Sequence, residues 1–443
     1  MSKERKRILL LAYDFPPYLS VGGIRPYFWY QHLHEHDVFP VVITRQWSNK
    51  NGSVLDYIAP SKSSFIEHEV TENGELFKAP YYQNFSNRLI TKFGENKFVF
   101  LRKTFSFFSE FSQFFLPTGT KRSIYKVADE YLSQNKVDVI IATGDPFVLF
   151  HYANKLSKKH QIPWIADYRD PWSHYYERKK NISFSVLKWN EKRIVKNSSH
   201  ITTVSEFIAA KLQSLLGKIP TTIISNGYDD QLIDKSTSIQ QEKEKLTLAY
   251  AGTVYEWHPL ERFFEAVFEF KNARPNFKFK IVFYGLNQVS RLQDALKLYP
   301  NLIQHIQLEP RCSNDELIPR LRKHHVMLLF NYYAYMGTKI YDYLGVNRSI
   351  LLCFENDPDA NKLKDSLYRI NDINANQNLQ ADTIKKHNAG KIAQDKDDLV
   401  RILNLYADEF EENKSISCHS INTQVYSRTN QVKQLATLIK KHF

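Results

Sequence analysis

Short runs of β-branched and other apolar residues recur along this chain, separated by longer segments with helical spacing. In the first half, such runs lie at 7–12, 38–44, 137–142, 163–167, 200–204 and 221–225. Between two of them, the apolar residues of 146–160 follow the period of an amphipathic helix. A strand, a helix and a second strand within about thirty residues form a βαβ unit. Such units require a parallel sheet with right-handed crossovers, so this feature restricts the chain to the α/β class.

The same alternation begins again after a polar segment, 234–245, which lacks aromatic residues although they make up 14% of the chain. We interpret this segment as the start of an interdomain boundary. Beyond it we predict strands at 246–251, 278–284, 303–308, 326–330 and 349–354, and helices at 260–274, 314–323 and 339–345. The prediction is two Rossmann-like, doubly wound parallel-sheet domains, at 1–233 and 234–423. A C-terminal helix at 424–443 can pack on either domain.

The formal net charge of +13 over 443 residues favours anionic partners. Nucleic acid, an anionic membrane face and phosphorylated substrates all meet this description. The sequence has no zinc-ligand pattern, no arginine-rich tail and no recognisable nucleic-acid motif, so we expect no nucleic-acid partner. A nucleic-acid-binding protein is therefore the most remote alternative, and it predicts salt-sensitive binding without a nucleotide preference.

The cysteines and the hydropathy of the chain indicate the cellular compartment in which the protein is expected. The three cysteines, Cys312, Cys353 and Cys418, are widely spaced and form no CxxC motif, which argues against a disulfide framework. The apolar run at 8–12 is too short for a signal segment. No stretch approaches the roughly 18 apolar residues of a membrane-spanning helix. We expect a cytoplasmic protein.

Glycine is scarce, with 14 residues in the chain, so its positions are informative. Seven glycines lie at or soon after predicted strands: Gly22, Gly23, Gly144, Gly227, Gly252, Gly285 and Gly337. In open α/β sheets, ligands bind outside the carboxyl ends of the strands, where the backbone must approach them closely. Any one of these residues has an ordinary turn as its alternative, but together they favour a ligand cleft between two facing sheets.

A glycine pair, Gly22 and Gly23, follows the first predicted strand, with Arg25 just beyond it. Backbone N–H groups in such a loop can bind a phosphate. The second half opens in a similar way, with a strand followed by Gly252 and Thr253. Neither a GxGxxG fingerprint nor a Walker sequence is present, so neither a dinucleotide site nor a P-loop is predicted.

Gly337 and Thr338 stand just before a predicted helix. This position offers free N–H donors, a hydroxyl and the positive end of a helix dipole, which together form a pyrophosphate cradle. Lys339 can add positive charge, and the carboxylate of Asp342 can accept hydrogen bonds from ribose hydroxyls. The alternative is an ordinary capped helix with an i,i+3 ion pair between Lys339 and Asp342.

A further candidate is the end of the strand at 163–167, where Asp167, Arg169 and Asp170 follow a run of buried-looking residues. Two carboxylates that flank an arginine are costly to bury unless they are paired or used in function. The alternative is a structural Arg–Asp pair that fixes the loop.

These segments, in this order and spacing, resemble glycosyltransferase family 4, which has the GT-B fold. The resemblance runs over nearly the full chain, through 15–23, 138–146, 164–172, 203–205, 225–229, 250–253 and 337–344. It implies a retaining glycosyltransferase that moves a sugar from a nucleotide diphosphate-sugar to an acceptor, with no metal and no other cofactor.

The resemblance also assigns the two domains. The C-terminal domain would bind the donor and the N-terminal domain the acceptor. Backbone N–H groups, helix dipoles and basic side chains would stabilise the charge on the leaving diphosphate. A leaving phosphate oxygen would deprotonate the incoming hydroxyl, so that a protein base is dispensable. The donor-binding residues implied are Gly252, Thr253, His258, Gly285, Arg311, Gly337, Thr338 and Asp342, and those of the acceptor or phosphate loop are Gly22, Gly23 and Arg25.

The chain departs from the family pattern in its donor half. Members often carry two glutamates separated by seven residues; Asp342 matches the second, but Ala334 replaces the first and cannot bind sugar hydroxyls ionically. The basic residues that commonly follow the Gly-Thr loop are also missing. His258 stands there, either as a phosphate ligand or as a surface or helix-capping histidine, and Lys339 or Arg311 supplies the charge instead.

A third departure lies in the acceptor half. Arg169 replaces the strand-end histidine of several members. The catalytic candidates in this chain are therefore Arg169, Asp170 and Lys339.

The segment 84–122 is rich in phenylalanine and in basic residues. One interpretation is an amphipathic segment that docks on an anionic bilayer. The other is a helix that buries its phenylalanines in the domain core. The first makes the protein a peripheral enzyme on the inner face of the plasma membrane, and its acceptor a lipid-linked or surface polysaccharide precursor. Two further alternatives to the transferase are a nucleotide-sugar epimerase of the same fold and a nucleotide-sugar-binding protein without turnover.

Overall fold

A computed structural model describes residues 5–18, 20–48, 54–173, 182–367 and 378–443. The chain forms two compact units. Unit 1 comprises residues 1–225 and 431–443, and unit 2 comprises residues 226–430. The divisions fall after Ser225 and Asn430. The sequence had predicted them after residues 233 and 423.

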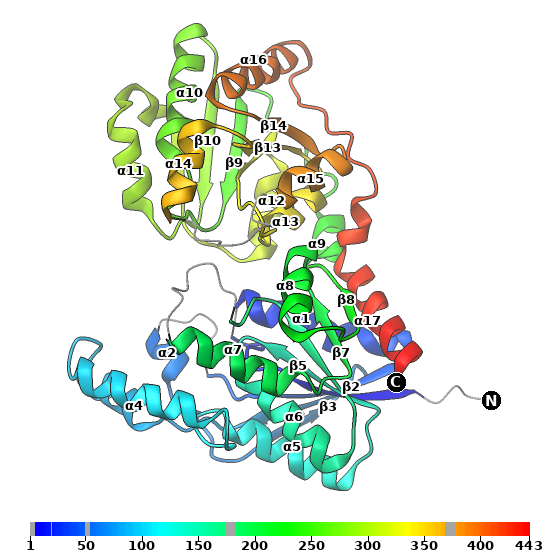
Figure 1. Cartoon of the computed structure of the whole chain (residues 1–443). Helices are drawn as coiled ribbons and strands as arrows, with labels where there is room; N and C mark the ends of the chain where they lie inside the picture. The colour runs from blue at the N-terminus through cyan, green and yellow to red at the C-terminus, as the bar shows by residue number, and fades with distance from the viewer. Residues whose placement is uncertain (1–4, 19, 49–53, 174–181, 368–377) are drawn as a thin grey trace. The chain divides into compact units, whose positions relative to one another are not determined.

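The described part of unit 1 contains an eight-stranded sheet in the order β3-β4-β2-β1-β5-β6-β7-β8 (Figure 1). The strands are β1 (Lys6–Leu11), β2 (Val38–Arg45), β3 (Glu67–Val70), β4 (Glu75–Ala79), β5 (Val139–Gly144), β6 (Trp164–Tyr168), β7 (His200–Thr203) and β8 (Thr221–Ile223). All neighbours pair in parallel except β3 and β4. The six predicted strands are confirmed. β3 and β4 were not predicted, because neither strand contains an apolar run and β3 is exposed throughout.

Helices surround this sheet. They are α1 (Val21–His32), α2 (Val54–Ile58), α3 (Phe85–Phe93), α4 (Val99–Ser112), α5 (Arg122–Gln134), α6 (Val148–His160), α7 (Ile182–Val195), α8 (Glu206–Leu216) and α17 (Arg428–His442), with a 3-10 turn at Leu33–His36. Figure 1 shows α17, in red, beside the sheet of unit 1. Val432, Leu435 and Ile439 of this helix are fully buried in the same core as Ile8 and Leu10 of β1. Apolar packing therefore fastens the C-terminal segment to unit 1.

Unit 2 is built on a second parallel sheet, in the order β11-β10-β9-β12-β13-β14 (Figure 1). Its strands are β9 (Leu246–Ala251), β10 (Phe279–Tyr284), β11 (Ile306–Glu309), β12 (Val326–Phe330), β13 (Ser349–Cys353) and β14 (Gly390–Ala393). The five predicted strands are confirmed, whereas β14 was not predicted because its sequence, which begins with Gly390 and Lys391, contains no apolar run. Two large apolar clusters belong to this unit, as expected for a doubly wound sheet with helices on both faces.

The helices of unit 2 are α9 (Asp230–Lys235), α10 (Leu260–Ala273), α11 (Val289–Lys297), α12 (Asn314–Arg322), α13 (Lys339–Val346), α14 (Pro358–Leu367), α15 (Leu379–Lys386) and α16 (Lys396–Asn413), with 3-10 turns at Pro300–His305 and Thr423–Tyr426. α13 follows β12 through a loop and begins at Lys339. This places its N-terminus beyond the carboxyl end of a central strand, where a ligand site is expected in this kind of fold.

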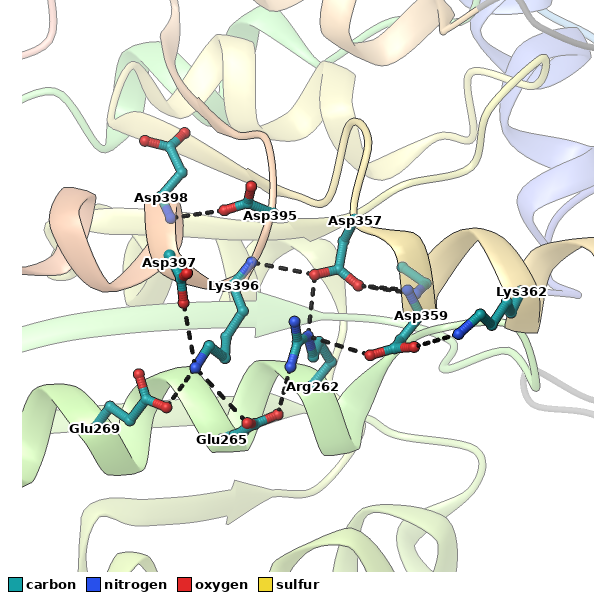
Figure 2. Close-up of polar contacts among 11 residues, drawn as sticks. Arg262, Glu265, Glu269, Asp357, Asp359, Lys362, Asp395, Lys396, Asp397 and Asp398 are labelled. Carbon is teal, nitrogen blue, oxygen red and sulfur yellow. Dashed lines mark hydrogen bonds and ion pairs between the residues drawn. The ribbon is translucent and has the colours of Figure 1, made fainter.

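A network of charged side chains ties α10 to the segments that follow β13 and β14 (Figure 2). The carboxylate of Asp357, whose side chain is fully buried, accepts hydrogen bonds from Nε of Arg262 at 3.0 Å and from the backbone of Ala360 at 2.9 Å. Burial alone would raise the pKa of Asp357, but these hydrogen bonds and the positive charge of Arg262 hold the pKa below its ordinary value.

Asp357 is therefore expected to make unit 2 sensitive to acid. Because its pKa is lower in the folded state, its stabilising contribution is present above the unfolded pKa of about 4 and is lost as the pH falls through the folded pKa. Asp357→Asn should lower the free energy of unfolding by about 1–3 kcal/mol at pH 6. That deficit should shrink at pH 3. Urea titrations read by hydrogen exchange in α10 measure it; a deficit of equal size at both pH values would contradict the prediction.

Candidate functional site

The loops after β9 and β10 bring two glycines to the carboxyl edge of the unit 2 sheet. Gly252 and Gly285 have φ values of 117° and 63°, in the region that favours glycine. The N–H of Gly252 donates to the carbonyl of Tyr284 at 3.0 Å, and that of Gly285 donates to Glu309 at 2.9 Å. Both N–H groups thus continue the sheet hydrogen bonds and are not available to a phosphate. These glycines instead allow close approach by other residues.

Lys339 makes one of these approaches. A Cβ atom on Gly252 would lie 3.1 Å from Cε of Lys339, so the lysine stem crosses the face of this glycine. Nζ of Lys339 lies 3.7 Å from Oδ2 of Asp342, and the Asp342 side chain is only 10% exposed. The i,i+3 pair expected as the alternative is thus present, and it holds the ammonium group beside the N-terminus of α13.

The N-terminus of α13 supplies the donors expected of an anion site. Gly337 has a φ of 66° and turns the chain into the helix. Thr338 occupies the N-cap position, but its hydroxyl makes no capping hydrogen bond. The first N–H groups of a helix have no intrahelical acceptor, so they and the helix dipole favour a bound anion. The predicted cradle of Gly337, Thr338 and Lys339 therefore forms one local surface.

His258 differs from the phosphate ligand that the resemblance implied. The N–H of Tyr255 donates to Nδ1 of His258 at 3.3 Å, which leaves the proton of the neutral ring on Nε2. The ring is buried, and burial, together with the charge of Arg291, lowers the pKa of His258 to about 3. The ring is therefore neutral near pH 7 and cannot supply positive charge. Thr253 is exposed, and so is Arg311, which lies beside Gly285 and remains available as a cation.

Aromatic rings adjoin the cradle, and the sequence reasoning did not assign them a role. The ring centroids of Tyr255 and Trp257 are 4.6 Å apart, and those of Tyr255 and Tyr332 are 5.1 Å apart, with nearly parallel planes in both pairs. Cδ1 of Tyr332 lies 3.7 Å from the position of a Cβ atom on Gly337. Ala334 is fully buried. The sequence feature that could have indicated these stacked rings is the density of aromatic residues at 255–257 and 332–335.

In unit 1, Arg169 lies at the carboxyl edge of the sheet, after β6. Its Nε donates to the carbonyl of Gly144 at 2.9 Å and its Nη2 to that of Asp145 at 2.6 Å. A Cβ atom on Gly22 would overlap Nη1 of Arg169. Gly22 is therefore needed because the guanidinium lies over the first turn of α1.

Gly22 and Gly23, which the sequence predicted to form a phosphate loop, instead lie in the first turn of α1. Ser20 caps this helix, and its Oγ accepts a hydrogen bond from the N–H of Gly23 at 3.0 Å. Glycine is a poor helix former, so the sequence pattern favoured a loop. The cap hydroxyl and the packing of Arg169 override that preference.

Arg25 does not face a ligand either, because it forms a buried ion pair. Its Nη2 lies 3.0 Å from Oδ1 of Asp167, and the two side chains are 4% and 0% exposed. Asp167 also accepts hydrogen bonds from the hydroxyls of Thr143 and Thr202 at 2.9 and 2.8 Å. Nη1 of Arg25 donates to the carbonyl of Ile224 at 2.8 Å. The structural Arg–Asp pair considered for this strand end exists, but its arginine is Arg25.

Carboxylates surround Arg169 instead of phosphate-binding groups. Asp14 accepts a hydrogen bond from the Ser20 hydroxyl at 2.7 Å. Burial raises the pKa of Asp14, and Asp145 raises it further, whereas the Ser20 hydrogen bond and Arg169 lower it. Asp145 and Asp170 are exposed. This edge of unit 1 is suited to hydroxyl groups, which can donate to carboxylates, more than to an anion.

The sequence family described as Glycosyltransferase Family 4 matches residues 95–232. Among solved structures, sucrose-phosphate synthase from Thermosynechococcus elongatus is similar with a TM-score of 0.61 and 12% identity, over 99% of both chains. No curated protein matches the sequence.

Two further structures show the same fold. One is described as trehalose-6-phosphate from E. coli bound with UDP-2-fluoro glucose, with a TM-score of 0.54 and 11% identity over 99% of this chain and 96% of the other. The second is a putative UDP-N-acetylglucosamine 2-epimerase from Listeria monocytogenes, with a TM-score of 0.51 and 11% identity over 99% and 97%. These likenesses confirm the predicted fold of two parallel-sheet α/β domains.

The family match and the fold confirm the predicted resemblance. The chain is a glycosyltransferase with a family 4 segment and the GT-B fold. In the part of the chain that the structure describes, no group of three or more His, Cys, Asp or Glu side chains is placed to hold a metal ion.

Proposed function

We propose that this protein is a retaining glycosyltransferase that uses a nucleotide diphosphate-sugar and needs no metal. The observation that carries this proposal is the N-terminus of α13, where Gly337, Thr338 and Lys339 precede or begin the helix and Asp342 lies one turn further. The first N–H groups and Lys339 would bind the diphosphate. Asp342 would accept hydrogen bonds from the ribose hydroxyls, while the exposed Arg311 would add positive charge.

The proposed reaction exchanges one C–O bond for another on the same face of the sugar. The bond between the anomeric carbon and the diphosphate breaks, and the acceptor oxygen bonds to that carbon. The acceptor proton passes to a phosphate oxygen of the leaving group, so no protein base is needed. The α13 N–H groups and Lys339 would stabilise the charge that develops on the diphosphate. In unit 1, Arg169 and Asp170 would orient the acceptor hydroxyl.

A thermal-shift screen against nucleoside mono- and diphosphates tests the donor site. A ligand at 100 times its dissociation constant should stabilise the folded state by about 2.7 kcal/mol. We expect one diphosphate to stabilise the wild type and to have much less effect on Asp342→Ala. Asp294→Ala is the matched control, because Asp294 forms an exposed i,i+3 pair with Lys297 in the same unit. Equal stabilisation of Asp342→Ala and wild type would contradict the proposed donor site.

Product analysis then separates the remaining functions. A transferase needs an acceptor and releases the nucleoside diphosphate with each glycosyl transfer. An epimerase, the function named for one structural neighbour, would convert the nucleotide sugar without any acceptor. A nucleotide-sugar-binding protein, which the loss of the motif glutamate at Ala334 makes an alternative, would bind the donor and form neither product.

We also propose that unit 1 docks on an anionic membrane through α3 and α4. α4 has no buried residue, and its Phe100, Phe107 and Phe108 are 86%, 61% and 65% exposed. Figure 1 shows α4, in cyan, at the periphery of unit 1. This differs from the alternative in which the helix buries its phenylalanines in the core. An exposed apolar surface of this kind is usually covered by a partner.

The charge of these helices favours a bilayer as the partner. Basic side chains lie among the phenylalanines, at Arg88, Lys92, Lys97, Arg102 and Lys103. Such residues attract anionic headgroups while aromatic rings enter the interface. No helix in the described residues is long and apolar enough to cross a membrane. Docking of this kind would give the enzyme access to a lipid-linked or surface polysaccharide precursor, which is the acceptor class that we propose.

Flotation with vesicles of anionic lipid measures this docking. Wild type should float with the vesicles, whereas a double Phe107→Ser and Phe108→Ser variant should bind at least about 100-fold more weakly. Each buried phenylalanine is worth about 1.5–3 kcal/mol. Phe65→Ser is the control, because Phe65 is 79% exposed in unit 1 but lies outside α3 and α4. Wild type that stays with the soluble fraction would contradict the docking proposal.

A further inference from the structure

A series of aromatic rings continues from α4 onto α7. The inference drawn from it rests on the membrane docking proposed for α3 and α4. The ring centroids of Phe107 and Phe111 are 6.2 Å apart, and those of Phe111 and Phe115 are 5.1 Å apart. The ring of Phe115 lies 6.3 Å from that of Trp189, which belongs to α7. The exposed phenylalanines of α4 are therefore continuous with a ring on α7.

Arg193 holds the two parts of this series together. Its guanidinium lies over the rings of Phe115 and Trp189, at 4.7 and 5.1 Å from their centroids. Its Nη2 also donates to the carbonyl of Phe114 at 2.6 Å and to Oδ1 of Asn190 at 3.1 Å. One side chain thus binds both α7 and the residues that follow α4, so the Trp189 ring is held beside the phenylalanines.

Trp189 is the exception among the six tryptophans of the chain. It is 54% exposed, whereas the other five are at most 7% exposed: Trp29, Trp47, Trp164, Trp172 and Trp257. Tryptophan is enriched at membrane–water interfaces, because its ring is apolar while its N–H can remain hydrated. An exposed tryptophan at the end of an exposed phenylalanine series is suited to that boundary.

The charge around this ring is positive. Lys188 and Lys192 are exposed and lie on the same face of α7 as Trp189, because they are one residue before it and three residues after it. Within 184–197 the single carboxylate is that of Glu191, which is fully buried. Every exposed charge of this segment is therefore positive, which complements an anionic surface.

An open pocket of about 350 Å³ lies between this face of α7 and α8. Two ammonium groups, two hydroxyls, an indole ring and a leucine line it: Ser185, Lys188, Trp189, Lys192, Ser214 and Leu215. Ammonium and hydroxyl groups donate hydrogen bonds to phosphate oxygens, and none of these six residues is acidic. Donors of this kind beside an aromatic ring suit a lipid headgroup, whose phosphate lies next to the apolar part of the bilayer.

We propose that α7 is a second membrane-docking element of unit 1. Trp189 enters the bilayer interface beside the α4 phenylalanines, and Lys188 and Lys192 bind the phosphate of an anionic lipid headgroup. A protein partner would also cover apolar rings, but a face whose exposed charges are all positive matches the single sign of charge that anionic lipids present.

The fluorescence of Trp189 tests this inference, because the other five tryptophans are buried. Vesicles of phosphatidylglycerol should shift its emission maximum to shorter wavelengths, and brominated acyl chains in the same vesicles should quench it. Vesicles of phosphatidylcholine alone should have little effect. Trp189→Phe keeps a ring at this position, so it should float with the vesicles as wild type does but lack the emission change.

Charge variants test the contact with the headgroup. Lys188→Gln combined with Lys192→Gln should weaken binding to phosphatidylglycerol vesicles by about 30-fold. Lys433→Gln combined with Lys441→Gln is the matched control, because it removes the same charge from exposed positions of α17 in unit 1. The control variant should lose far less affinity, since α17 lies outside the proposed surface.

The outcomes separate this inference from the docking through α3 and α4. Flotation without a change in Trp189 emission would overturn the role of α7 and leave α3 and α4 as the docking elements. An equal loss of affinity in the two double-lysine variants would show that net charge, and not the pocket, attracts the vesicles. An emission change caused by inorganic phosphate alone would assign the pocket to a soluble phosphate instead. Wild type that does not float would contradict the docking of both surfaces.

Discussion

Replacing Asp167 by alanine is expected to lower the melting temperature of unit 1 by on the order of 10 °C. The substitution leaves the guanidinium of Arg25 buried without its counter-charge. It also removes the acceptor of two threonine hydroxyls, those of Thr143 and Thr202. Breaking a buried ion pair on one side costs about 3–5 kcal/mol. In a domain of this size, each kcal/mol corresponds to about 2–4 °C.

A double variant separates the lost charge balance from the lost packing. When both members of a buried pair are replaced by apolar residues of similar volume, the stability often changes little. Arg25→Met combined with Asp167→Val should therefore melt at a higher temperature than Asp167→Ala alone. Thermal unfolding, with hydrogen exchange in β5 and β6 to report on unit 1, provides the measurement. A melting temperature of Asp167→Ala within about 2 °C of wild type would show that Arg25 finds another partner.

Lys339→Ala is expected to lower kcat by about 100- to 1,000-fold. The effect is that of removing one preorganised group that stabilises transition-state charge. The stability should hardly change, because Lys339 is partly exposed and pairs with Asp342 at 3.7 Å. Pairs of this kind contribute less than about 1 kcal/mol. The release of nucleoside diphosphate from the donor identified in the thermal-shift screen measures the rate.

Two control variants test whether the loss of rate comes from the positive charge of Lys339. Lys297→Ala removes the lysine of an exposed i,i+3 pair in the same unit and should leave kcat unchanged. Lys339→Arg keeps the positive charge and should restore part of the rate. A variant Lys339→Ala that retains full kcat and only raises KM would show that Lys339 binds the donor equally in the ground and transition states. Arg311 would then be the next candidate for the charge on the leaving group.

Most of the fold could be predicted because buried parallel strands have a local signature. β1, β9 and β12 are buried over most of their length, so their sequences are mainly apolar. β3 and β14 lack such runs and were missed. Their pairing is determined by neighbours distant in sequence, since β3 pairs with β4 and β14 with β13.

The candidate site residues also differ in whether the sequence could bring them together. Gly337, Thr338, Lys339 and Asp342 lie within one loop and helix start, so spacing alone predicted that they would come together. The rings of Tyr255 and Tyr332 stack on each other although the two residues come from different loops. Aromatic residues have many positions in a chain of this composition, and no local pattern shows which of them stack.

The sequence by itself determined the α/β class, the restart of the pattern in the second half and the helix N-terminus at Lys339. Each of these depends on residues close together in the chain. Only the tertiary structure decided that Arg25 pairs with Asp167 and that Arg169 lies over Gly22. A buried charge must find its partner wherever the fold brings one, because leaving it unpaired is costly. Those partners are distant in sequence, because Gly22 and Arg25 lie in α1, whereas Asp167 lies in β6 and Arg169 follows it.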